Sequence, residues 1–530
     1  MSGVGYRQLW AADPGGWRAA GVAWAGLTTP VERRAEGLRG AADRLRVGWS
    51  GAAASAADAR LAAHRAELLS IAPALIEADQ VLADLSVRLT VAKAQLTEAV
   101  AQADAAGLLV DRSGAVHVDS ARGGATERSG VAAARVAASL RGALEVAAAA
   151  DRVAADRLDE LARAAGAGWV SPPPPGRPAP GAPPALVRAW WSGLTPAQRR
   201  WLIGHEPAVV GRLDGVPVAA RDQANRLRLG GWRAELLAER RRLLARVPPG
   251  PLTVLRLRAL AARLAGLDAL AGRLTAGGAP RAYLLGVDTA GEGRAVVTLG
   301  DPDHAERVLT YVPGMTAGLD DAPGELGRAA RVLDRCAALA PTERSAAVLW
   351  LDYDAPDFLT EATSADQARD AGPALHRFQE GLRASHEGPP ARQTVLGHSY
   401  GSLVVGVTAR EHGLAADALV FVGSPGVGVS RAAELGVPPA EVWASSAPDD
   451  VIRAARPADE LGRRALLGAV PLAAVLGWPD RTGHELWFGH DPSDPGFGGR
   501  VFGSGRGGHT GYWDPGNPAL DGMARVVLGR

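Results

Sequence analysis

The chain has 530 residues, of which 47% are apolar and 22% are charged. This length and composition predict several packed domains and exclude a wholly disordered protein. The 58 basic and 57 acidic side chains leave a net charge of +1, so no overall positive charge indicates a nucleic-acid partner. The single cysteine excludes a disulfide framework and a zinc site built on cysteines.

The sequence contains no run of about 18 uncharged apolar residues, so we expect no membrane-spanning helix. Its first residues, MSGVGYR, lead into no apolar core of the length found in signal peptides. We therefore expect a cytoplasmic protein. Export by a route that uses no Sec signal peptide is the alternative.

Residues 1–168 are rich in alanine and predict a helical bundle. Thr29-Pro30-Val31-Glu32 matches a capping box with proline at the first helical position, which predicts a helix to about Val47. A second long helix follows, and Pro73 is expected to kink it. Leucines repeat along it at close to helical spacing, which predicts one buried face: Leu61, Leu68, Leu75, Leu82, Leu85 and Leu89.

Between these two helices lies the tripeptide Trp49-Ser50-Gly51. Farther along, the apolar stretches 108–110 and 115–118 flank Asp-Arg-Ser-Gly, a pattern that predicts a small hairpin. Another helix, at roughly 124–165, completes this first region.

Residues 169–185 are dominated by proline and glycine, which predicts an interdomain linker. Residues 186–280 are helical in pattern and form a connecting segment. From 281 to 530, short β-branched runs alternate with helical patterns, which predicts a mostly parallel sheet flanked by helices, an α/β fold. The expected strands are 282–287, 295–299, 307–312, 346–351, 393–397, 418–423 and 441–444.

The strongest chemical signal is Gly397-His398-Ser399-Tyr400-Gly401, which follows a predicted buried strand and precedes a predicted helix. This is the setting of a nucleophile elbow, in which a sharp turn presents a serine hydroxyl. Glycine on both sides lets the neighbouring chains approach, and the helix N-terminus stabilises a developing oxyanion. The alternative is an ordinary structural turn.

A nucleophilic serine needs a base, and the base needs a carboxylate to orient it. Downstream, His509 lies in a glycine-rich loop near the carboxyl end, which suits the base, and His490 is the alternative. The acid should follow the predicted strand 441–444, where Asp450 precedes two apolar residues; Asp449 is the alternative. A purely structural reading is that both aspartates cap a short helix.

Backbone N–H groups are expected to bind the oxyanion. One is that of Tyr400, after the serine, and the other is that of Met315 or Thr316, after the predicted strand 307–312. Gly314 would allow the close approach. An ordinary turn at the end of that strand is the alternative.

The long insertion between the acid and the base contains an amphipathic stretch, 458–478, which is either a lid over the site or a fixed helix. Asp491 and Asp494 lie close to His490, but without further ligands at supporting spacing we expect no metal site. No organic cofactor is expected either.

Several segments of residues 281–530 resemble an actinobacterial α/β-hydrolase family of unassigned function. They are Val312-Pro313-Gly314, TVLGHSYGSLVVG (394–406), VFVGSPGVGV (420–429), VWASSAPDDVI (442–452), HDPSDPGFGGRVF (490–502) and GHTGYWD (508–514). Residues 190–226, which contain GRLDGVPVAARDQANR, resemble the segment that precedes the hydrolase in this family. The resemblance implies a hydrolase fold with a catalytic triad of Ser399, Asp450 and His509.

The first 168 residues resemble the W-x-G helical hairpin proteins of type VII secretion systems, on the basis of Trp49-Ser50-Gly51 between two amphipathic helices. That resemblance implies a helical protein partner and export by the type VII route.

Together these features predict a serine hydrolase, esterase-like or lipase-like, acting on a small ester or acyl substrate. The alternative is a secretion-associated or partner-binding helical protein that carries a hydrolase fold of little or no activity.

Overall fold

The computed structural model describes residues 4–118, 127–167, 174, 176–179, 181–245, 250–276, 280–356, 361–454 and 485–530. The chain divides into two compact units. The helical unit comprises residues 1–174, 195–206 and 275–280, and the sheet unit comprises 175–194, 207–274 and 281–530. The sheet unit thus includes most of what the sequence indicates as linker and connecting segment.

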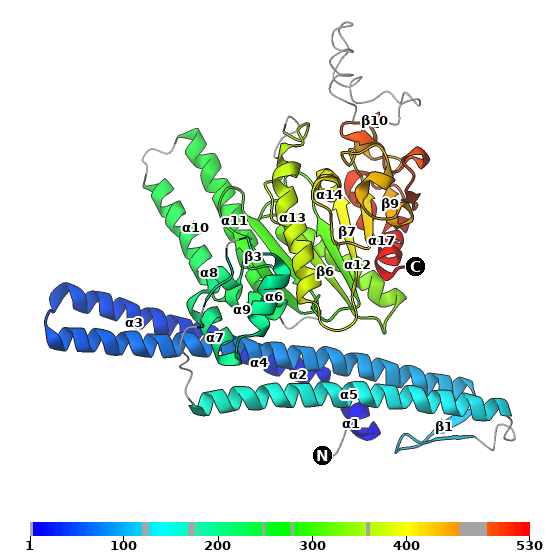
Figure 1. Cartoon of the computed structure of the whole chain (residues 1–530), viewed down its shortest axis with the longest axis horizontal. Helices are drawn as coiled ribbons and strands as arrows, with labels where there is room; N and C mark the ends of the chain where they lie inside the picture. Colours follow the sequence, from blue (N-terminus) through cyan, green and yellow to red (C-terminus); the bar gives the residue numbers. More distant parts are fainter. Residues whose placement is uncertain are drawn as a thin grey trace, which may run out of the picture. The chain divides into compact units, whose positions relative to one another are not determined.

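The helical unit is built from long helices and one small hairpin (Figure 1). Its helices are α1 (Tyr6–Ala11), α2 (Pro14–Gly26), α3 (Thr28–Gly48), α4 (Ala52–Ala105), α5 (Glu127–Ala167) and α7 (Pro196–His205). The predicted hairpin is confirmed, since β1 (Leu108–Val110) pairs antiparallel with β2 (Val116–Val118). The predicted capping box is wrong, because α3 begins at Thr28 and no side chain caps it.

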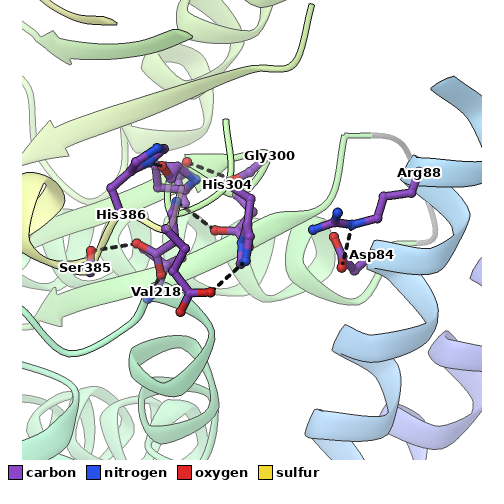
Figure 2. Close-up of polar contacts among 12 residues, drawn as sticks. Asp84, Arg88, Val218, Gly300, His304, Ser385 and His386 are labelled. Carbon is purple, nitrogen blue, oxygen red and sulfur yellow. Dashed lines mark hydrogen bonds and ion pairs between the residues drawn. The ribbon is translucent and has the colours of Figure 1, made fainter. Parts of the chain in front are cut away.

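The core of this unit forms where α4 packs against α2, α3 and α5. Of the predicted leucine stripe, Leu82, Leu85 and Leu89 are buried, whereas Leu61, Leu68 and Leu75 are only partly covered. A buried ion pair between Arg18 and Asp79, at 2.6 Å, links α2 to α4. On α4, Arg88 donates to Asp84 one turn away (Figure 2).

The sheet unit confirms the predicted α/β fold. Its eight-stranded sheet has the order β12-β9-β8-β7-β5-β6-β4-β3, and only β4 runs antiparallel to its neighbours. The strands are β3 (Ala282–Asp288), β4 (Arg294–Leu299), β5 (Arg307–Val312), β6 (Ser345–Leu351), β7 (Arg392–His398), β8 (Ala418–Val422), β9 (Val442–Ser445) and β12 (Arg500–Val501). All seven predicted strands are present, and their apolar residues fill the core.

Helices flank this sheet, with α12 (Ala322–Leu339) packed against α17 (Pro518–Leu528) and α13 (Asp366–Ser385) packed against α14 (Tyr400–Glu411) (Figure 1). The other helices are α6 (Pro184–Ser192), α8 (Pro207–Val210), α9 (Val218–Arg226), α10 (Leu229–Leu244) and α11 (Pro251–Thr275). A short hairpin of β10 (Glu485–Leu486) and β11 (Gly489–His490) is separate from the main sheet. Because β7, β9 and β12 are parallel, the loops that follow them leave the same edge of the sheet.

Side chains of α9 cover the free edge of β3, the outermost strand. An exposed edge strand presents unpaired backbone groups, which must find other partners. Asp222 accepts a hydrogen bond from the Leu284 N–H at 2.7 Å. Arginine and asparagine side chains of α9 donate to the carbonyl groups of Ala282, Leu284 and Leu285. The side chains of α9 therefore take the place that a ninth strand would have at this edge of the sheet.

A buried carboxylate joins α9 and α13 to the loop before β5. Asp303 is 2% exposed and accepts hydrogen bonds from the Val218 N–H and the Ser385 hydroxyl, both at 2.6 Å (Figure 2). Burial, together with the nearby Asp301, raises the pKa of Asp303 to about 7.

Within the described residues, every helix is too short or too polar to cross a lipid bilayer. The amphipathic stretch 458–478 lies outside the described residues, so its interpretation as a lid or a fixed helix stays a prediction.

Candidate active site

Ser399 occupies the sharp turn between β7 and α14. Its φ of 52° and ψ of −127° are strained for a residue other than glycine. A Cβ atom at Gly401 would lie 2.3 Å from the Val312 carbonyl oxygen, and one at Gly397 would lie 2.6 Å from the Gly401 carbonyl oxygen. Neither position has room for a side chain, as the glycines on both sides of the serine predicted.

His509 lies in a 3-10 turn, Gly508–Trp513, after β12, and its ring contacts Asp450, which follows β9. The Nδ1 atom of His509 is 2.9 Å from Oδ1 and 3.0 Å from Oδ2 of Asp450. Burial raises the pKa of Asp450, but hydrogen bonds from His509, Tyr512 and the Ile452 N–H outweigh burial and hold that pKa below its usual value. An ionised Asp450 fixes the proton of His509 on Nδ1 and leaves Nε2 to accept another.

The structure adds Tyr512, which the sequence analysis missed. Its buried hydroxyl donates to Asp450 Oδ2 at 2.5 Å and accepts from the Ala447 N–H at 2.9 Å. Tyr512 thus holds Oδ2 of the carboxylate, whereas the Ile452 N–H donates to Oδ1. No pattern in the sequence indicates that the Tyr512 hydroxyl binds the carboxylate of Asp450.

The alternative acid, Asp449, and the alternative base, His490, make other contacts. Asp449 is exposed and accepts from the N–H groups of Gly507 and Gly508 at 3.2–3.3 Å, so it contacts the loop before His509 and not its ring. Both ring nitrogens of His490 face carboxylates, Glu485 at 3.2 Å and Asp494 at 3.1 Å. In the part of the chain that the structure describes, no group of three or more His, Cys, Asp or Glu is arranged to hold a metal ion.

Gly423 lies close to both the backbone of Ser399 and the His509–Asp450 pair. The Ser399 N–H donates to the carbonyl of Val422, the residue before Gly423, at 3.0 Å. A Cβ atom at Gly423 would lie 2.9 Å from Asp450 Oδ2 and 3.2 Å from His509 Nδ1. With a φ of 55°, this position is restricted to glycine by conformation and by space.

The loop after β5 approaches Ser399 as expected. A Cβ atom at Gly314 would lie 2.6 Å from Ser399 Cβ and 3.2 Å from its hydroxyl oxygen. The Thr316 N–H donates to the Pro356 carbonyl, which leaves Met315 as the donor candidate in this loop. Among the described residues, neither the Met315 N–H nor the Tyr400 N–H has a hydrogen-bond partner.

His398 supports the backbone of His509. It is 4% exposed, and its Nε2 lies 2.9 Å from the His509 carbonyl oxygen. Burial, with the nearby His509 and Arg328, lowers the pKa of His398 to about 3. The ring is therefore neutral near pH 7 and donates from Nε2 to that carbonyl. In the sequence His398 is only the variable position of the elbow motif.

A family model described as alpha/beta hydrolase matches residues 288–459. The uncharacterized protein Rv2079 of Mycobacterium tuberculosis is 30% identical over 383 residues, which cover 67% of this chain and 56% of that protein. The chain thus spans little more than half the length of that relative. The uncharacterized protein Mb0988c of Mycobacterium bovis is 36% identical over 192 residues, covering 34% of this chain and 71% of that protein.

Among solved structures, the esterase PE8 has 18% identity and a TM-score of 0.27, over 43% of this chain and 93% of that one. The esterase LipW from Mycobacterium marinum has 15% identity and a TM-score of 0.29, over 54% and 92%. On the match to the family model and on the mycobacterial relatives, the chain belongs to the alpha/beta hydrolase family.

Proposed function

We propose that this protein is a serine hydrolase that cleaves ester-type bonds, with Ser399 as nucleophile, His509 as general base and Asp450 as the orienting acid. The observation that carries the proposal is the hydrogen bond between His509 Nδ1 and an ionised Asp450, next to Gly423 and the strained Ser399. This combination of a strained serine, an oriented imidazole and a paired carboxylate is what acyl transfer requires.

In the proposed reaction, the Ser399 hydroxyl oxygen attacks the ester carbonyl carbon while His509 Nε2 takes the hydroxyl proton. The N–H groups of Tyr400 and Met315 stabilise the oxyanion of the tetrahedral intermediate. His509 then gives its proton to the leaving alcohol, and an acyl-serine remains. Water, deprotonated by His509, attacks the acyl carbon and releases the acid, which restores Ser399.

The choice of an ester over an amide rests on analogy at the level of the fold, since many hydrolases of this fold act on esters. A small acyl or ester molecule is therefore the proposed substrate. No step uses a metal or an organic cofactor.

The test is labelling with a fluorophosphonate probe and turnover of p-nitrophenyl esters of increasing chain length. We expect the wild type to be labelled and active, and Ser399→Ala to lose both. Ser430→Ala, at an exposed serine of the same unit, should keep both. A wild type that is neither labelled nor active on any ester would favour a hydrolase fold of little or no activity.

The helical unit supports a second function, the binding of a helical protein partner. Trp10, Trp17 and Trp24, spaced seven residues apart on α1 and α2, are 50%, 45% and 47% exposed. Exposed aromatic side chains are typical of contact surfaces. Sedimentation analysis of the purified chain should show that it associates. The double variant Trp17→Ala with Trp24→Ala should not associate, whereas Val131→Ala, at an exposed residue on α5, should associate as the wild type does.

We also propose that the helical unit directs export by the type VII route, with Trp49 exposed in the turn between α3 and α4. The test is fractionation of cells with and without the type VII machinery. An exclusively cytosolic pool in both strains would contradict export and leave a cytoplasmic protein.

A further inference from the structure

A polar cavity of about 530 Å³ lies in the sheet unit, at the side of the sheet that carries β3, β4 and β6. Its walls come from the end of β3, the start of β4, the residue after β6, the loop between α8 and α9, α9 itself and α13. The strand β5 separates β6 from β7, which leads into Ser399, and the cavity is lined by none of the proposed catalytic residues. Cavities of roughly this volume commonly hold small-molecule ligands.

Charged side chains dominate the cavity. It is lined by the four arginines Arg212, Arg221, Arg294 and Arg377 and by the three aspartates Asp214, Asp288 and Asp352. Arg221 pairs with Asp214 at 2.9 Å, and Arg212 approaches Asp288 at 3.6 Å. Two of the three carboxylates are thus already used to neutralise two of the guanidinium groups.

Burial raises the pKa of Asp352, the third carboxylate, and the nearby Arg294 opposes that shift. Within the described part of the chain, Arg294 and Arg377 form neither a hydrogen bond nor an ion pair. They come from different elements, β4 and α13, and line the same cavity. Four arginines against three aspartates leave the lining with one positive charge in excess, which a bound anion would neutralise.

We propose that this cavity is a binding site for a small molecule that carries a phosphate monoester. Arg294 and Arg377 bind its terminal oxygens, with Arg212 at the rim, and Asp352 accepts a hydrogen bond from a hydroxyl group of the same molecule. Donors that converge from several elements suit the three terminal oxygens of a phosphate better than the two oxygens of a carboxylate. The site is separate from the proposed reaction and does not depend on it.

The test uses the full chain and glycerol 3-phosphate as the probe, with glycerol and acetate as controls at matched ionic strength. Titration calorimetry and thermal denaturation should show binding and a higher Tm with glycerol 3-phosphate but with neither control. Arg294→Gln and Arg377→Gln should each weaken the binding by about tenfold or more, because each removes charge-assisted hydrogen bonds. Arg331→Gln, at an exposed arginine of α12 outside the cavity, should bind as the wild type does.

Ser399→Ala should also bind glycerol 3-phosphate with unchanged affinity, which separates this site from the proposed hydrolase chemistry. The proposal is overturned if the probe does not bind at millimolar concentration. It is equally overturned if the variant lacking both Arg294 and Arg377 binds as tightly as the wild type. Equal binding of acetate would contradict the assignment to phosphate.

Discussion

The Nδ1 atom of His509 lies 2.9 Å from Oδ1 of Asp450, although 59 positions separate the two residues in the chain. The parallel strands β9 and β12 bring them together, because the loops that carry both residues leave the same edge of the sheet. Tyr512 holds the carboxylate, His398 holds the backbone of the histidine, and Gly423 leaves room for the ring. Each of these three features can be changed by a single substitution.

Gly423→Ala should separate the His509–Asp450 pair without unfolding the protein. The new Cβ atom would lie 2.9 Å from Asp450 Oδ2 and 3.2 Å from His509 Nδ1, so one of the two side chains must move. A displacement of about 1 Å at a catalytic group can lower the rate by roughly 100-fold. We expect a loss of that size in kcat for p-nitrophenyl ester hydrolysis.

Gly436→Ala is the matched control, because its φ of 74° carries a similar backbone strain while the nearest atom to its Cβ is 3.9 Å away. An equal loss of kcat in both variants would show that backbone strain, and not the contact with the pair, is responsible.

Tyr512→Phe should lower activity and shift its pH dependence. The hydroxyl of Tyr512 helps to hold the pKa of Asp450 below its usual value, so its removal raises that pKa. The acidic limb of kcat/KM should therefore move to higher pH. Loss of a hydrogen bond to a charged group corresponds to a decrease of roughly tenfold to 100-fold in kcat/KM. An unchanged pH profile would contradict a role for Tyr512 in holding the carboxylate.

The same variant leaves the Ala447 N–H without its partner. An unsatisfied buried donor destabilises a protein by about 1–3 kcal/mol, and denaturant unfolding should detect that loss.

His398 should make the protein less stable in acid. Its pKa is lowered to about 3 in the folded state by burial and by the nearby His509 and Arg328, so the unfolded chain binds this proton more readily. The stability that neutral His398 contributes is complete above the unfolded pKa of about 6.5 and is lost as the pH falls towards 3. Each pH unit in that window lowers the free energy of unfolding by up to about 1.4 kcal/mol through this group.

His398→Gln keeps a donor near the His509 carbonyl but does not titrate, so its stability should fall less steeply between pH 6 and pH 4. Denaturant unfolding at several pH values measures the two slopes. Identical slopes in the wild type and the variant would rule out His398 as a source of the acid sensitivity.

Asp222→Asn should destabilise the sheet unit through the edge of β3. The carboxylate of Asp222 is fully buried, pairs with Arg226 at 2.8 Å and Arg281 at 3.4 Å, and accepts the Leu284 N–H. The amide cannot neutralise these two buried arginines, and breaking a buried ion pair on one side costs about 3–5 kcal/mol. We expect a loss of that size in the free energy of unfolding.

Asp268→Asn provides the comparison, because its ion pair with Arg233 is about half exposed. Removing an exposed pair changes stability by less than about 1 kcal/mol. Similar stabilities for the two variants would mean that α9 does not secure the edge of the sheet.

The order of strands and helices in the sheet unit could be predicted because it depends on local patterns. Buried strands such as Thr394-Val395-Leu396 are apolar runs, and the glycines beside Ser399 mark a turn that other residues cannot form. The strands β10, β11 and β12 were missed, since two residues are too few to show a period. The predicted capping box failed because the chain from α2 enters α3 at Thr28 with no side-chain cap.

The amino-acid sequence by itself determined the α/β class, the elbow at Ser399 and a short set of candidate acids and bases. Only the tertiary structure decided that Asp450, and not its neighbour Asp449, contacts His509, and that Tyr512 and His398 support the pair. It also decided that the polar side chains of α9 complete the edge of β3. The physical reason is that hydrogen bonds between residues far apart in the chain depend on how parallel strands align their ends, and local sequence patterns do not record that alignment.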